Sequence, residues 1–303
     1  MSNIIYPIVI ANNTKIKYKL TGNICIRPLE DDEKYQFFGE NEIGYDFING
    51  SISEIKNKIQ IKSGRHVHGS WIDCDNPNFR HLMAASHCLE YKSVTVSHYW
   101  TNVIVNIAFK LVELTSTCAF VWINSDLHSS GIDDNDDKDI SLNSLDGPFG
   151  YLTLDRKNAY QIKYILSKID LKDERFFLMA SMYLDALRIG NGRIRTRFLN
   201  LSTILEMLYA PDGNKGEITY KISMRAAKIL KSNSNNSEDA YQLSKEFKKI
   251  YITRSGLIHS GHSKYLTDTY FYKLAEIIRI SLNIYLKDKN IFTEENLDKF
   301  LLG

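Results

Sequence analysis

The sequence predicts an α+β protein, with a β-rich domain over residues 1–150 followed by an all-α helical bundle over residues 151–303. In the first part, short runs of β-branched and aromatic residues favour strands. In the second part, apolar residues recur at three- and four-residue spacing, as on the buried face of a helix. The balance of charge changes at the same place. Residues 1–150 contain 13 Lys and Arg and 19 Asp and Glu, whereas residues 151–303 contain 25 Lys and Arg and 17 Asp and Glu. The two parts are therefore expected to face different partners.

Two N-terminal segments have the composition and alternation of strands. Residues 3–11 form a short apolar run rich in isoleucine. Residues 15–20 alternate lysines with Ile16, Tyr18 and Leu20, which places these three side chains on one face. Further segments of similar composition cover 64–72, 92–100, 102–110 and 117–124, whereas 79–91 could form a short helix instead. We expect a β-sandwich or an irregular β-sheet.

A dense acidic stretch from Asp133 to Asp139 marks the expected domain boundary. It superficially resembles a calcium-binding loop, but it lacks the central glycine and terminal glutamate that an EF-hand loop requires. Serine, asparagine, glycine and proline follow it up to Gly150. The stretch is therefore predicted to be a solvated linker rather than a metal site.

About seven helices joined by short connections are predicted after the linker. Asp155 can cap a helix that runs to about Ile169, and Asp173 can cap one that runs to Arg188. The other helices are expected over residues 193–209, 217–231, 238–253, 265–286 and 293–302.

The cysteines Cys25, Cys74, Cys88 and Cys118 are scattered through the first half without a Cys-x-x-Cys pair. The N-terminus has no basic stretch followed by a long apolar run, so no signal peptide is expected. No run approaches the roughly 18 apolar residues of a membrane-spanning helix. These features predict a cytoplasmic protein with reduced thiols and no membrane partner.

One segment, residues 248–261, combines residue types that can carry chemistry. Glycine-rich phosphate loops, His-Glu-x-x-His, paired-cysteine metal knuckles and nucleophile elbows are absent from the sequence. The segment sets Arg254 and His259 five positions apart. Histidine can move a proton to or from the ribose oxygens of RNA, and arginine can stabilise charge on the phosphate. The pair therefore suits cleavage of RNA without a metal or a cofactor.

The spacing of the pair constrains how it can act. Five residues along a straight helix advance about 500°, which leaves the two side chains roughly 140° apart. Either the backbone breaks at Gly256, or two copies of the helix share one cleft. We favour the second, a homodimer in which each protomer contributes one Arg254 and one His259. Because Arg80 and His87 form a second match at a longer gap, the spacing alone identifies nothing.

The sequence around the pair carries a family resemblance. Tyr251-Ile-Thr-Arg254-Ser-Gly-Leu-Ile-His259-Ser-Gly261 resembles the Arg-x4-6-His signature of HEPN ribonuclease domains, and more narrowly the Apea-like HEPN families of bacterial anti-phage defence. The preceding order is similar too: a helix bearing Glu206, a glycine-containing loop, and a helix with small residues over 218–230. The likeness covers about residues 160–290, half of the chain.

The resemblance implies a HEPN-like helical bundle that dimerises and acts as a metal-independent endoribonuclease. It implies that Arg254 and His259 are the catalytic pair. Many HEPN motifs place Asn, Asp or His directly after the arginine, where this sequence has Ser255, a weaker polar group. This departure leaves room for reduced activity or for a role in binding only.

Further residues are expected around the pair. Glu206 either orients Arg254 as a salt-bridge partner or satisfies a buried polar contact, and Ser255 and Tyr251 are expected to support the site. His262 is expected to be a surface neighbour. The basic residues that either follow an RNA backbone or form a solvated face are Arg193, Arg195, Arg197, Arg225 and Lys228.

In the first half, His66, His68 and Cys74 are residue types that zinc accepts. The two histidines flank one residue, so on a strand they point to the same face. Their spacing fits no zinc pattern, however. They are therefore expected to be packing or surface residues, and no metal is predicted.

The sequence thus predicts a metal-independent endoribonuclease, a toxin or anti-phage defence effector whose acidic N-terminal domain senses a trigger or holds a regulatory partner. The alternative is a non-catalytic dimeric module that binds nucleic acid or protein. A third possibility is a nucleotide-binding HEPN domain without ribonuclease activity.

Overall fold

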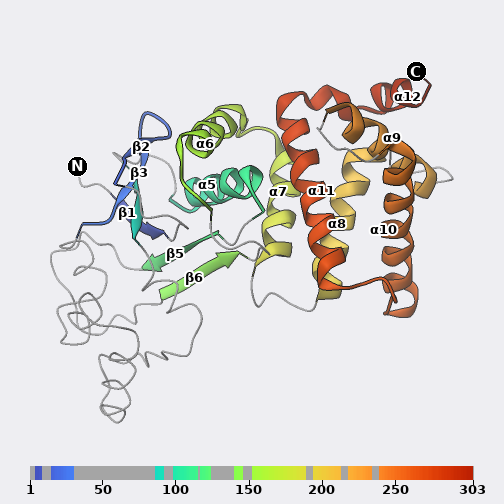
Figure 1. Ribbon diagram of the computed structural model, residues 1–303, viewed down its shortest axis with the longest axis horizontal. Coiled ribbons are helices and arrows are strands. Elements are labelled where there is room, and N and C mark those ends of the chain that lie inside the picture. The colour runs from blue at the N-terminus through green and yellow to red at the C-terminus, as the bar shows by residue number, and fades with distance from the viewer. Residues whose placement is uncertain are drawn as a thin grey trace, which may run out of the picture. The chain divides into compact units, whose positions relative to one another are not determined.

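The computed structural model describes residues 4–8, 15–30, 86–91, 98–114, 117–123, 140–145, 152–188, 194–212, 218–233 and 239–302. The chain is mostly helical, with a small antiparallel sheet near the N-terminus, so it is α+β as predicted (Figure 1). Its contacts divide it into two compact units. The strand unit comprises residues 1–97, 117–144 and 151–159, and the helical unit comprises residues 98–116, 145–150 and 160–303.

The strand unit contains a four-stranded antiparallel sheet in the order β1-β4-β3-β2. Its strands are β1 (Ile4–Ile8), β2 (Tyr18–Lys19), β3 (Ile24–Pro28) and β4 (His87–Tyr91). Leu89 of β4 pairs with Tyr6 on one side and with Ile26 on the other, and Leu89 and Ile26 are completely buried. A second sheet pairs β5 (Thr117–Ile123) with β6 (Ile140–Leu145). Strands therefore lie where they are predicted near residues 3–11, 15–20 and 117–124.

A buried carboxylate, Glu90, is held between β3 and β4. It is the cross-strand neighbour of Cys25, whose thiol donates to Glu90 Oε2 at 3.0 Å. The Lys17 ammonium lies 3.2 Å and the Arg27 guanidinium 3.4 Å from the same oxygen. Burial acts to raise the pKa of Glu90, but these hydrogen bonds and charges outweigh burial and lower the pKa to about 2. The cluster fixes the register of the two strands, because a slip of one residue would turn Glu90 to the other face.

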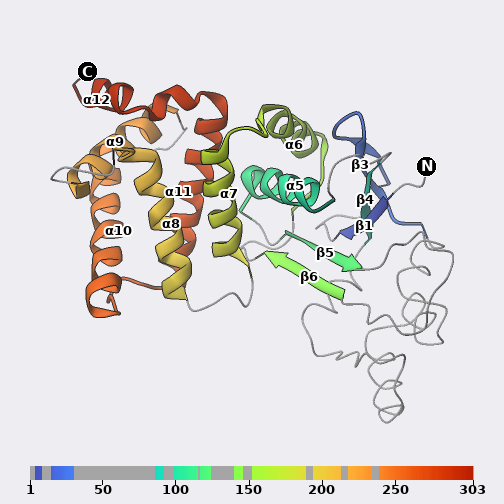
Figure 2. The ribbon, with the colours of Figure 1, turned by 180° about the vertical axis from the view of Figure 1, so that it is seen from behind.

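The helices after residue 155 follow the predicted order (Figures 1 and 2). They are α6 (Arg156–Lys168), α7 (Glu174–Leu187), α8 (Ile194–Tyr209), α9 (Ile218–Asn233), α10 (Ala240–Ser260), α11 (Asp268–Lys287), the short 3₁₀ helix η1 (Lys289–Phe292) and α12 (Glu294–Leu302). Asp155 accepts a hydrogen bond from the Asn158 N–H at 2.7 Å, and Asp173 accepts one from the Phe176 N–H at 3.0 Å. Both predicted N-caps are therefore confirmed.

A helix, α5 (His98–Val112), occupies the strand predicted over 102–110 and the last three residues of the one predicted over 92–100, of which 92–97 lie outside the described residues. This prediction is wrong because the segment is buried on nearly every side, with Val105, Ile107 and Phe109 fully inaccessible. Its β-branched and aromatic residues favour a strand locally, and tertiary packing overrides that preference. α5 packs against α7 and α11, so it belongs to the helical unit although it precedes residue 150.

Helix α8 lies at the centre of the bundle and packs against α7, α9, α10 and α11. Its buried residues include Phe198, Leu205 and Tyr209. The Tyr209 hydroxyl lies 2.7 Å from the Ser281 hydroxyl of α11, and its ring packs beside Phe247 of α10. The hydroxyl pair joins α8 to α11, and the packing of the two rings joins α8 to α10.

Candidate active site on helix α10

Helix α10 carries both residues of the predicted pair on one unbroken helix. Asp239 caps its N-terminus by accepting a hydrogen bond from the Gln242 N–H at 2.7 Å, and the helix continues to Ser260. The predicted end, residue 253, therefore falls short of the observed one. Since the helix passes through Gly256 without interruption, the structure excludes a backbone break as the way to bring Arg254 and His259 together.

Arg254 forms an ion pair with Glu206 of α8. Its Nη2 donates to Glu206 Oε2 at 2.9 Å, and its Nε lies 2.9 Å from Oε1 in a charge contact without hydrogen-bond geometry. The side chains keep 22% and 20% of their surface exposed, so a ligand can still approach the guanidinium. Of the two roles left open for Glu206, the structure shows the salt bridge.

Tyr251 lies one turn before Arg254 and completes a half-buried cluster that joins α8 to α10. The guanidinium carbon of Arg254 lies 5.5 Å from the centre of the Tyr251 ring, in a cation–π arrangement. Burial raises the pKa of Tyr251, and the charge of Glu206 adds to this effect. Burial also raises the pKa of Glu206, against the charge and hydrogen bond of Arg254 and the hydrogen bond of Tyr251.

His259 lies in the last turn of α10 with its side chain exposed. On this continuous helix its side chain leaves the axis roughly 140° from that of Arg254. The structure therefore does not bring the two side chains together within one chain.

His259 lies on what we call the outer face of α10, a row of residues at three- and four-residue spacing. The outer face consists of Tyr241, Lys245, Lys248, Ile252, Ser255 and His259. Tyr241 is 65% and Ile252 46% exposed. Ser255 is partly buried on this face, one turn before His259.

The turn after His259 folds closely back onto α10. Gly261 ends the helix in the left-handed conformation, with φ 70°. The chain then passes over Gly256, where a Cβ atom would lie 3.0 Å from the carbonyl oxygen of His262. Ser260 Oγ donates to the Gly256 carbonyl at 2.7 Å. Gly256 and Gly261 therefore allow the turn next to His259 to lie against α10. The sequence motif did not reveal this role.

Arg225 is buried, which corrects its prediction as an RNA-binding residue. Its side chain is 0% exposed, and its guanidinium pairs with Glu294 and Asp298 of α12. It also donates to the Tyr209 carbonyl at 3.0 Å. Its Nε has no partner but is buried with the rest of the side chain, so no donor is accessible to a phosphate backbone, and Arg225 serves to fasten α12 to α9.

Arg197 is half-buried and also joins helices. Its Nε donates to the Ala186 carbonyl of α7 at 2.6 Å, and its guanidinium carbon lies 4.5 Å above the centre of the Phe271 ring of α11. These contacts hold α8 against both neighbours. One guanidinium donor and one face of the group are thus occupied, which favours a structural role for Arg197.

The other predicted RNA contacts are placed differently. Lys228 Nζ donates to the Leu301 carbonyl at 2.8 Å and stays partly exposed. Arg195, in the first turn of α8, is exposed and can reach a phosphate. Arg193 lies outside the described residues. The predicted basic cluster thus does not form one surface within the described part of the chain.

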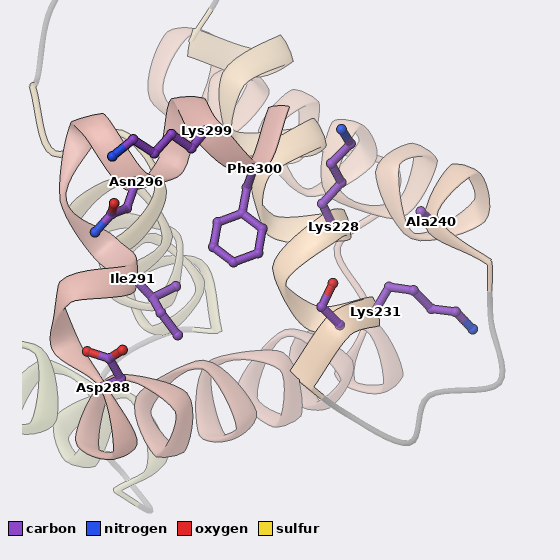
Figure 3. A pocket seen from close by; sticks show the side chains of 9 residues that line it. Lys228, Lys231, Ala240, Asp288, Ile291, Asn296, Lys299 and Phe300 are labelled. Atoms are coloured by element: carbon purple, nitrogen blue, oxygen red, sulfur yellow. The ribbon is translucent and has the colours of Figure 1, made fainter. Parts of the chain in front are cut away.

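A cavity of about 570 Å³ between α9, η1 and α12 was not predicted from the sequence (Figure 3). Its lining includes Lys228, Lys231, Lys299 and Phe300. The lysines come from two helices far apart in sequence, so their proximity depends on the tertiary fold.

Within the described part of the chain, no three His, Cys, Asp or Glu residues are grouped closely enough to hold a metal ion. His66, His68, Cys74 and the acidic stretch at 133–139 lie outside it. Among the described helices, none is long and apolar enough to cross a membrane.

The chain matches no protein-family model, no curated protein and no solved structure. Its candidate site is therefore defined by the geometry of α8 and α10 alone. That geometry provides an anchored arginine, an exposed histidine and a rigid helix between them.

Proposed function

We propose that the protein is a metal-independent endoribonuclease of the HEPN type, with Arg254 and His259 as its catalytic pair. The observation that carries this proposal is that Arg254, held by an ion pair with Glu206 of α8, lies on the same unbroken helix as the exposed His259. Glu206 restrains the guanidinium, so a phosphate meets a preorganised fork of donors.

The proposed reaction requires proton transfer and charge stabilisation only. The ribose 2′-oxygen attacks the neighbouring phosphorus, and the bond from phosphorus to the 5′-oxygen breaks. One histidine takes the proton of the 2′-hydroxyl, and a second gives a proton to the leaving 5′-oxygen. Arg254 stabilises the negative charge on the other phosphate oxygens. The products are a 2′,3′-cyclic phosphate and a free 5′-hydroxyl.

A homodimer supplies the second histidine. The exposed apolar side chains Tyr241 and Ile252 of the outer face favour coverage by a second copy of the chain. When two α10 helices meet along this face, the two His259 side chains face one cleft, and each partly exposed Arg254 reaches it from the neighbouring side of α10, which a single helix cannot achieve.

Charge supports RNA as the substrate. Residues 151–303 contain 25 Lys and Arg against 17 Asp and Glu, and Lys245 and Lys248 are exposed on the outer face beside Ile252. An excess of basic residues attracts a phosphate backbone. An enzyme that cleaves cellular or phage RNA would act in the cytoplasm as a toxin or defence effector.

The direct test is cleavage of single-stranded RNA by the full-length protein in EDTA. We expect wild type to cleave, and Arg254→Ala and His259→Ala to lose about a hundredfold or more in rate. His262→Ala is the matched control, because His262 is also an exposed histidine, in the turn that follows α10. Cleavage by His259→Ala at the wild-type rate would refute the assignment.

A non-catalytic dimeric module that binds nucleic acid or protein is the second candidate. It is favoured by Ser255 in place of a stronger polar group, and by Glu206, which already neutralises Arg254. Expression in bacteria discriminates between the two. A ribonuclease arrests growth and His259→Ala relieves the arrest, whereas a binding module is tolerated in both forms.

We further propose that the acidic N-terminal part regulates cleavage by a trigger or partner. Removing residues 1–150 is unsuitable as a test, because α5 packs within the helical bundle. Replacing the five aspartates of residues 133–139 by asparagine removes their charge without shortening the chain. Higher basal cleavage of RNA supports inhibition by this stretch, and an unchanged rate contradicts it.

A further inference from the structure

Helix α6 presents two tyrosines on its exposed side. Tyr160 and Tyr164 are 72% and 42% exposed, and their spacing of four residues places them next to each other on the same side of the helix. The opposite side of α6 is buried through Ala159, Ile162 and Ile165. The helix is therefore fixed by its apolar side, and the two rings are left in contact with solvent.

Lysines flank the two rings on both sides. The Lys163 side chain leaves the helix axis about 60° to one side of Tyr160, and the Lys168 side chain about 80° to the other side. Both lysines are exposed, and Lys168 Nζ lies 5.6 Å from the centre of the Tyr164 ring. We call Tyr160, Lys163, Tyr164 and Lys168 the tyrosine face of α6.

The charge of α6 is entirely positive. Its 13 residues include Arg156, Lys157, Lys163 and Lys168 and no aspartate or glutamate. Among the residues that the structure describes, no carboxylate forms an ion pair with Lys163 or Lys168, whereas Lys221 of α9 is paired with two. The ammonium groups beside the rings are therefore available to an anionic partner.

We propose that the tyrosine face of α6 binds single-stranded nucleic acid, with bases stacked on Tyr160 and Tyr164 and phosphates in contact with Lys163 and Lys168. An aromatic ring stacks on any unpaired base, and cations beside it follow the backbone. The bases of a duplex are stacked on one another, so they do not reach the rings. A membrane surface fits the face less well, because the apolar residues of α6 are buried in the protein and cannot enter a bilayer.

The tyrosine face shares no residue with the outer face of α10 or with the Arg254–Glu206 cluster. It supplies contacts to a strand that the predicted basic residues, from Arg193 to Lys228, do not gather on one surface. The inference rests on the proposed function in taking RNA as the strand that is held for cleavage. Binding itself requires neither Arg254 nor His259.

Fluorescence anisotropy on the full-length protein tests the proposal with a labelled oligodeoxythymidine of about 12 nucleotides. This probe has no 2′-hydroxyl, so the proposed reaction cannot cleave it. We expect Tyr160→Ala and Tyr164→Ala each to weaken its binding about fivefold or more. Lys163→Ala and Lys168→Ala should each reduce the slope of the logarithm of the binding constant against the logarithm of salt concentration by about 0.7.

Tyr220→Ala and Lys299→Ala are the matched controls, because Tyr220 is 56% and Lys299 65% exposed and neither lies on α6. Both should bind the oligonucleotide as wild type does, and circular dichroism establishes that every variant is folded. Wild-type affinity in the double variant Tyr160→Ala/Tyr164→Ala overturns the site. Equal affinity for the single strand and for its duplex overturns the stacking of bases. Binding to phosphatidylserine vesicles that the double variant loses, while it keeps the oligonucleotide, overturns the nucleic-acid assignment in favour of a membrane.

RNA cleavage separates this inference from the proposed function. The double variant should raise KM for single-stranded RNA about tenfold or more with little change in kcat, since the face holds the strand and takes no part in the chemistry. Oligodeoxythymidine binding that depends on the face, without RNA cleavage by wild type, refutes the proposed function and supports this inference. Cleavage by wild type with the same KM in the double variant overturns this inference and leaves the proposed function in place.

Discussion

The Arg254 guanidinium and the Glu206 carboxylate, 48 residues apart in sequence, meet at 2.9 Å across α10 and α8. Arginine is long and flexible, and its rotamer freedom must be lost before it can act on a phosphate. Glu206 and the Tyr251 ring remove much of that freedom before any ligand arrives. Glu206 is therefore a positioning residue in the proposed reaction.

Glu206→Gln is expected to lower kcat for RNA cleavage about tenfold with little change in KM, because a glutamine can accept one hydrogen bond but cannot hold the charged fork. Steady-state kinetics measure this split. The matched control is Glu246→Gln, which removes a carboxylate of α10 that pairs with Lys249 and Lys273. An equal loss of kcat in the control would show that Glu206 acts only through the stability of α10.

The same ion pair is expected to contribute about 1 kcal/mol of coupling to the free energy of unfolding, since it is partly open to solvent. A double-mutant cycle of Glu206→Gln and Arg254→Gln in urea measures it. A coupling near zero would mean that the pair orders the site without stabilising the fold.

Gly256→Ala is expected to displace the turn after α10, because its Cβ would lie 3.0 Å from the His262 carbonyl oxygen. Gly261→Ala is expected to lower the free energy of unfolding by about 1 kcal/mol, since an L-residue is strained at the φ of 70° that Gly261 adopts. Denaturant unfolding and RNA cleavage measure the two effects. Gly22→Ala is the control, because nothing lies within 4 Å of its added Cβ. Wild-type behaviour of Gly256→Ala would show that the turn yields without cost.

Arg225→Ala is expected to lower the free energy of unfolding by about 2–3 kcal/mol, because it leaves a cavity and frees α12. Arg225→Met should cost less, about 1 kcal/mol, since it refills the volume while Glu294 and Asp298 stay in contact with solvent. Chemical denaturation measures both. The salt dependence of RNA binding should not change in Arg225→Met, and a shallower dependence would restore Arg225 as a phosphate contact.

The strand unit is expected to lose stability in acid through Glu90. Its pKa is lowered in the fold from 4.5 to about 2, so its contribution is fully present above about pH 4.5 and is lost as the pH falls towards 2. Glu90→Gln should lower the free energy of unfolding by about 3 kcal/mol at neutral pH. It should also flatten the dependence of that free energy on pH between about pH 2 and 4.5. Urea unfolding at several pH values measures this. Glu30→Gln, at an exposed position, should keep the wild-type slope of unfolding free energy against pH. An unchanged slope in Glu90→Gln would contradict the assignment of the acid loss to Glu90.

Local patterns in the sequence determined much of the helical architecture. Asp155 and Asp173 were identifiable as caps because capping depends on residues within one turn. The apolar spacing of α8 was equally local. The segment of α5 was misassigned, because its burial by α7 and α11 is not encoded in its own periodicity.

The candidate site, too, could be predicted from the sequence only in part. Arg254 and His259 were identifiable from their residue types and from the sequence that surrounds them. Burial of Arg225, the Arg254–Glu206 contact and the close approach to Gly256 depend on chain segments that are distant in sequence or on the turn that folds back. Helix caps and apolar stripes are set by neighbours along the chain, and so the sequence by itself determined them. Which charges are buried, which are paired and which stay free for a ligand was decided only by the tertiary structure, because desolvation and ion pairing depend on packing in space.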